Sequence, residues 1–80
     1  MELKETVDKV IRSRKTKKEK LDILFEMDCV MYTNLGTDST KTEREETKKN
    51  SRIIYRGIRE IDFYLGCALL RTQDDKKKAQ

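Results

Sequence analysis

The chain has 80 residues, of which 42% are charged and 35% hydrophobic, and its formal net charge is +4. A chain of this length forms one domain with a modest core, and such domains usually need a disulfide, a metal or a partner chain for extra stability. The sequence contains no histidine, its two cysteines follow no zinc-ligand spacing, and no apolar run approaches a membrane span. We therefore expect no cofactor, metal or membrane, and we expect added stability to come from self-association or a protein partner.

The first ten residues, MELKETVDKV, are charged and lack the apolar segment of a secretory signal. This pattern predicts a cytoplasmic protein, or one within an intracellularly assembled particle. In such a compartment Cys29 and Cys67 stay reduced, and we expect both to be small core residues.

The N-terminal segment carries apolar residues at helical spacing, namely Leu3, Val7, Val10 and Ile11. This spacing predicts a short amphipathic helix over residues 2–12. Thr16 followed by Glu19 fits a capping box, which would begin a second helix near Lys17. Positions on one helix face also follow one another at alternating spacings of four and three residues from residue 3 to residue 35, and no proline or glycine interrupts them. One unbroken helix over residues 2–35 and a break near residues 13–16 are therefore equally favoured.

The stretch LDILFEMDCVMYTNL, residues 21–35, is the densest apolar run in the chain. Its apolar residues cover most of a helical wheel, which is typical of a helix buried from more than one direction. Asp28 falls in the middle of the main apolar face. A carboxylate there needs a cationic or hydroxyl partner to offset the cost of its burial.

Gly36 is placed to end this helix in a left-handed conformation. Thr40 and Glu43 form a second capping box, and the last helix then begins near Lys41 and continues past Leu70. The final residues, 73–80, show no apolar periodicity and predict a flexible charged tail. A single helical domain should therefore span residues 1–72.

These elements predict an all-α fold, an antiparallel helical hairpin of two long helices. A break near residues 13–16 would give a three-helix arrangement, which could also close as a compact monomer. The short turn after Gly36 predicts a register in which Asp28 faces Lys48 as a buried ion pair. In that register the apolar run at residues 21–35 faces the polar half of the last helix.

This mismatch leaves large apolar side chains without a neighbour, and exposed apolar patches usually mark an interface. We therefore predict a non-enzymatic structural or adaptor subunit of a larger assembly, possibly a phage or viral particle, which completes its core with another chain. The predicted interface residues are Phe25, Met27, Val30, Met31, Tyr32, Leu35, Tyr55, Phe63 and Leu70.

Charge is distributed in blocks along the chain. Two basic blocks, residues 9–20 and 47–59, would lie side by side in the hairpin and form a basic band. Such a band binds phosphates through counterion release, so a small nucleic-acid-binding or regulatory protein is the alternative function. The possible phosphate contacts are Arg12, Arg14, Lys15, Lys17, Lys18, Lys20, Arg52, Arg56 and Arg59.

Enzymatic activity and a small-molecule substrate are not expected. No histidine is available as a general base, and the three serines fall in polar turns or on helix surfaces.

Overall fold

The computed structural model describes residues 2–79, with side chains described as far as Asp74. These residues form four helices and no strand: α1 (Leu3–Arg12), α2 (Lys17–Thr33), α3 (Lys41–Ile61) and α4 (Phe63–Ala79). The all-α class is therefore confirmed. The predicted count of two or three helices is wrong, because the chain breaks both before α2 and after α3.

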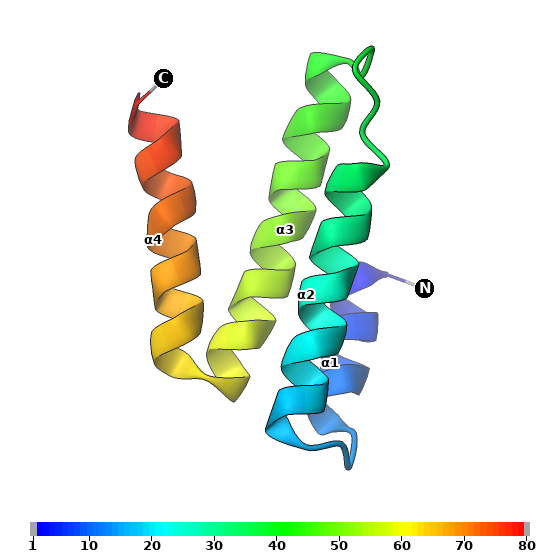
Figure 1. Cartoon of the computed structure of the whole chain (residues 1–80), viewed down its shortest axis with the longest axis vertical. Coiled ribbons are helices and arrows are strands. Elements are labelled where there is room, and N and C mark those ends of the chain that lie inside the picture. Colours follow the sequence, from blue (N-terminus) through cyan, green and yellow to red (C-terminus); the bar gives the residue numbers. More distant parts are fainter. Residues whose placement is uncertain (1, 80) are drawn as a thin grey trace.

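Helix α3 is the central element of the fold. It contacts each of the other three helices, and α1 also contacts α2. Figure 1 shows α4 and α2 on opposite sides of α3, with α1 behind α2. Within the described residues no Cα atom of α2 lies within 8 Å of one in α4. The molecule is accordingly flat, with extents of 39 × 26 × 17 Å.

Side-chain caps decide where α2 and α3 begin. The Thr16 hydroxyl accepts the Glu19 amide at 3.2 Å, and the Thr40 hydroxyl accepts the Glu43 amide at 3.1 Å. Each cap satisfies a backbone N–H that has no partner within its helix. Both capping boxes predicted from the sequence are thus confirmed.

The end of α1 is satisfied by side chains from the residues that follow it. The Ser13 hydroxyl donates to the Val10 carbonyl at 2.6 Å, and the Lys20 ammonium donates to the Ile11 carbonyl at 2.6 Å. Carbonyls in a last helical turn lack intrahelical donors, and a cation also complements the helix dipole there. These contacts support the break between residues 12 and 17, one of the two alternatives left open by the sequence.

The break between α3 and α4 contradicts the prediction of one helix from Lys41 past Leu70. Asp62 adopts an extended backbone conformation, and its carboxylate accepts the Leu65 amide at 3.2 Å. Asp62 therefore ends α3 and caps α4, as an aspartate at an N-cap position does. After this corner α4 folds back alongside α3 (Figure 1). Within the described residues it contacts neither α1 nor α2.

Two glycines permit the close approach of helices. A Cβ atom at Gly57 would lie 2.4 Å from Val7 Cγ1, where α1 crosses α3. A Cβ atom at Gly66 would lie 2.2 Å from Arg59 Cα, where α4 crosses α3. The close packing predicted at Gly57 is confirmed. Gly36 behaves differently from the prediction, because α2 ends at Thr33 and no described glycine has a positive φ.

The core is small. Its fully buried hydrophobic residues are Val7, Leu24, Ile54 and Ile58. Leu24 packs beside Ile54 and Ile58, and the register of α2 against α3 therefore differs from the predicted one. In this register Asp28 accepts hydrogen bonds from Ser51 and Tyr55. The predicted Asp28–Lys48 ion pair is therefore wrong, and the hydroxyl partner considered for Asp28 is the one observed. Lys48 is exposed.

The predicted tail, residues 73–80, begins within α4. Gln73 donates to the Lys48 carbonyl at 3.4 Å, and Asp74 pairs with Arg52 at 3.0 Å. Both residues therefore contact α3, which holds α4 beyond the boundary predicted at residue 72. The side chains of residues 75–79 and the whole of Gln80 lie outside the described residues, and the flexibility of this segment stays a prediction.

Candidate functional site

Large apolar side chains at the surface are the most prominent feature of the described residues. Five of them are exposed: Phe25 at 37%, Val30 at 50%, Tyr32 at 41%, Phe63 at 63% and Tyr64 at 85%. Four hydrophobic side chains are buried in the core. Eleven further hydrophobic side chains are partly buried and pack against this core.

Three exposed residues form a stripe on the outer face of α2. Phe25, Cys29 and Tyr32 follow one another at spacings of four and three residues, and all three are exposed. Residues at these spacings lie on one face of a helix. Leu24, on the opposite side of α2, is fully buried in the core. The prediction of Cys29 as a core residue is therefore wrong, while Cys67 is half-buried.

The nine predicted interface residues divide into two groups. Phe25, Val30, Tyr32 and Phe63 are exposed, as an interface requires. The others are partly buried, and most of them pack within the molecule. Met27, Met31 and Tyr55 pack against the core cluster, Leu35 lines a pocket, and Leu70 is half-buried on α4.

A second aromatic cluster lies where α4 begins. The rings of Phe63 and Tyr64 meet edge to face, with centroids 5.8 Å apart. Sequence reasoning missed Tyr64, since it expected these residues to lie inside one long helix. The available signal was Asp62, because aspartate is a common N-cap residue.

A polar cluster between α2 and α3 consists of Asp28, Ser51 and Tyr55, which are hydrogen-bonded to one another. Asp28 accepts the Ser51 hydroxyl at 2.6 Å and the Tyr55 hydroxyl at 2.9 Å. Ser51 is fully buried, and burial raises the pKa of Tyr55, with a further contribution from the Asp28 carboxylate. Each hydroxyl donates to the same carboxylate, so the cluster fixes the register of the two helices.

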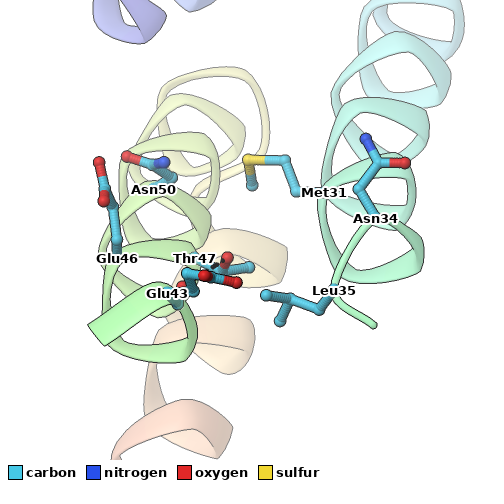
Figure 2. Close-up of a pocket in the computed structure, with 7 residues that line it drawn as sticks. All are labelled: Met31, Asn34, Leu35, Glu43, Glu46, Thr47 and Asn50. Carbon is cyan, nitrogen blue, oxygen red and sulfur yellow. Dashed lines mark hydrogen bonds between the residues drawn. The ribbon is translucent and has the colours of Figure 1, made fainter. Parts of the chain in front are cut away.

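A pocket of about 270 Å³ lies between the end of α2 and the start of α3. Figure 2 shows Met31 on α2 and Leu35 just after its end, both pointing toward α3, where Thr47 and Glu43 lie opposite Leu35. Its other polar lining residues are Asn34, Glu46 and Asn50. Among these lining residues the Thr47 hydroxyl donates to the Glu43 backbone carbonyl at 3.0 Å.

The predicted phosphate contacts are partly used inside the protein. Lys17 pairs with Asp62 at 3.2 Å, Arg52 pairs with Asp74, and Lys20 donates to the Ile11 carbonyl. The remaining six are exposed: Arg12, Arg14, Lys15, Lys18, Arg56 and Arg59.

The described residues contain no group of three or more histidine, cysteine, aspartate or glutamate side chains that could hold a metal ion. None of the described helices combines the length and the apolar character that crossing a bilayer requires.

No protein-family model, curated protein or solved structure matches this chain. The site is therefore defined by its own geometry: a four-helix chain whose outer faces on α2 and α4 carry exposed apolar side chains.

Proposed function

We propose that this chain is a non-enzymatic structural or adaptor subunit that buries its exposed apolar side chains against another protein chain. The observation that carries the proposal is that five large apolar side chains, four of them aromatic, are exposed. Single exposed hydrophobic residues are ordinary, but a stripe along one helix face and an aromatic pair beside a helix start are typical of interaction surfaces.

The energetic argument follows from burial. Enclosing one side chain of the size of Phe25 stabilises a protein by about 1.5–3 kcal/mol. At 37% exposure Phe25 forgoes about a third of that gain, and at 85% exposure Tyr64 forgoes most of it. A chain of this length has little stability to spare. A partner that covers Phe25, Tyr32 and Val30 would supply the missing burial.

The non-enzymatic part of the proposal rests on the polar groups. Ser51 is the one buried serine of the described residues, and its hydroxyl is already committed to the Asp28 carboxylate. A serine nucleophile needs a base that accepts its proton and an exposed oxygen to reach the substrate. Ser51 lacks that exposure, so the cluster is a structural link between α2 and α3.

Photo-crosslinking in the native cell tests the proposal. A benzoylphenylalanine residue introduced at position 25, 32 or 63 should form covalent adducts with another protein chain. The same residue at Lys49, an exposed polar position on α3, is the matched control and should form few adducts. Equal adduct yields at all four positions, or no adducts at any, would contradict an interface at the apolar surface.

A second candidate function, nucleic-acid binding, is favoured by one observation. Between α1 and α2 the chain places Arg12, Arg14, Lys15 and Lys18 together in an exposed loop and helix start. Binding through these residues would weaken steeply as salt rises. Replacing Arg14 and Lys15 by glutamate should then abolish binding to a mixed-sequence duplex, whereas replacing Lys48 and Lys49 should leave most of it. Binding unaffected by salt or by the first pair would refute this candidate.

A further inference from the structure

The outer face of α2 carries a longer pattern than its three apolar residues. Lys18, Asp22, Phe25, Cys29 and Tyr32 follow one another at spacings of 4, 3, 4 and 3 residues, and all five are exposed. Such spacing is the a/d seam of a coiled coil, which packs against a second helix. The apolar residues occupy its centre, and charged residues flank them toward the start of α2. Within the described residues no helix of the same chain covers this seam, since α2 contacts only α1 and α3.

We infer that a second copy of this chain packs antiparallel along this seam, so that the protein is a two-fold symmetric dimer through α2. The inference rests on the proposed function, and it names the partner. A two-fold interface must be self-complementary, with the same patch on both copies. An antiparallel seam pairs positions whose numbers sum to 54, which sets Phe25 against Cys29 of the second copy and Asp22 against Tyr32 of the second copy. The Phe25 ring thus contacts the Cys29 side chain, and the Tyr32 hydroxyl comes within reach of the Asp22 carboxylate.

The charge distribution favours the antiparallel orientation. Residues 12–20, around the start of α2, hold six basic residues and one acidic residue. Residues 34–46, from the end of α2 to the start of α3, hold four acidic and two basic residues. An antiparallel pair sets the basic end of each copy against the acidic end of the other, and does so twice. A parallel pair would align like charges, which disfavours it.

The same register contains one unfavourable contact. Glu26 is exposed and lies close to the two-fold axis at position 27, so the two Glu26 carboxylates approach each other. Like charges in such a position weaken association. The register therefore predicts that Glu26→Gln tightens the dimer, an effect that a contact elsewhere on the surface would not produce.

Light scattering on a sizing column tests the dimer. Purified, reduced protein at up to about 100 μM should have the mass of two chains, since a dimer of micromolar affinity is populated there. Phe25→Lys should weaken dimerisation by at least about 100-fold, because each copy loses one buried aromatic side chain. Tyr64→Lys, the same change at an exposed aromatic residue on α4, is the matched control and should leave the dimer intact. Circular dichroism of each variant separates loss of association from loss of folding.

Crosslinking fixes the register. A bismaleimide spanning about 10 Å should join Cys29 to Cys29 of the second copy, because the two lie four residues apart along helices about 8–10 Å apart. The experiment uses the C67S background, and E45C in a C29S/C67S background is the control that should not crosslink.

Three results would overturn the inference: a monomer at every concentration, a dimer that survives Phe25→Lys, or equal crosslinking through position 45. A monomer that nevertheless forms photo-adducts with a different protein at position 25 would refute the second copy as partner and leave the proposed function standing. A monomer without such adducts would refute both.

Discussion

Gly66 is the position at which an added methyl group would meet the backbone of a neighbouring helix. Its missing Cβ atom would lie 2.2 Å from Arg59 Cα and 2.4 Å from Arg59 N. Carbon atoms in contact need about 3.5 Å, so Gly66→Ala requires α4 to move away from α3 by about 1.3 Å. The obstructing atoms are backbone atoms of a helix, and no side-chain rotation relieves them.

Two opposing terms set the magnitude. Alanine gains about 1 kcal/mol over glycine in helix propensity, while overpacking typically costs 1–3 kcal/mol. Moving α4 also disturbs the Arg52–Asp74 pair, and within the described residues α3 is the one helix that contacts α4. We therefore expect a net loss of about 1–2 kcal/mol, which lowers the melting temperature by roughly 4–16 °C in a domain of this size.

Thermal unfolding followed by circular dichroism measures this loss, and amide hydrogen exchange locates it. Exchange should accelerate first in α4, since that helix loses its one support. Gly36→Ala is the control, because its Cβ atom would meet only the flexible Asp38 carboxylate, at 2.7 Å. A Gly66→Ala protein with unchanged melting temperature and unchanged exchange in α4 would refute the close crossing.

The other predictions concern the α1–α3 crossing, the buried cluster and the α3–α4 corner. Gly57→Ala should cost about 1–3 kcal/mol in urea unfolding through its clash with Val7, and Val7→Ala in the same chain should recover part of that loss; fully additive losses would argue against the contact. Ser51→Ala should cost about 1–3 kcal/mol, because it removes a 2.6 Å hydrogen bond to the Asp28 carboxylate, and an unchanged urea midpoint would contradict that role. The Leu65 amide and the Lys17 ammonium lower the pKa of Asp62, so its contribution to stability is present above the ordinary carboxyl pKa of about 4 and is lost as the pH falls through the lowered value. In the Asp62→Asn variant the melting temperature should fall less steeply as the pH is lowered. Identical pH profiles of the variant and the unchanged protein would show that the carboxylate is not involved.

Local signals in the sequence located the starts of α2 and α3 correctly. Threonine followed by glutamate three residues later marked the starts of α2 and α3, and the structure contains both hydrogen bonds. The end of α3 was missed because Asp62 lies within an apolar 4-3 pattern that continues into α4. The pattern describes which residues are apolar on a helix face, and it is equally compatible with two helices that fold back on each other.

The candidate site could be predicted only in part. Phe25, Val30, Tyr32 and Phe63 were predicted to be unburied and are exposed, whereas Tyr64 and Cys29 were missed. Exposure depends on how many neighbours a helix has. Helix α2 has α1 and α3 beside it and nothing over its outer face within the described residues, which a helical wheel alone does not show.

The sequence by itself determined the helical class, the caps that begin α2 and α3, and the excess of large apolar residues over the core that so short a chain can close. Each of these depends on contacts within a few residues or on composition. Only the tertiary structure decided the register of α2 against α3, the return of α4 along α3, and the hydroxyl partners of Asp28. Those depend on distant segments packing together, where the glycines at positions 57 and 66 allow close helix crossings and the seating of Leu24 beside Ile54 fixes which polar residues meet.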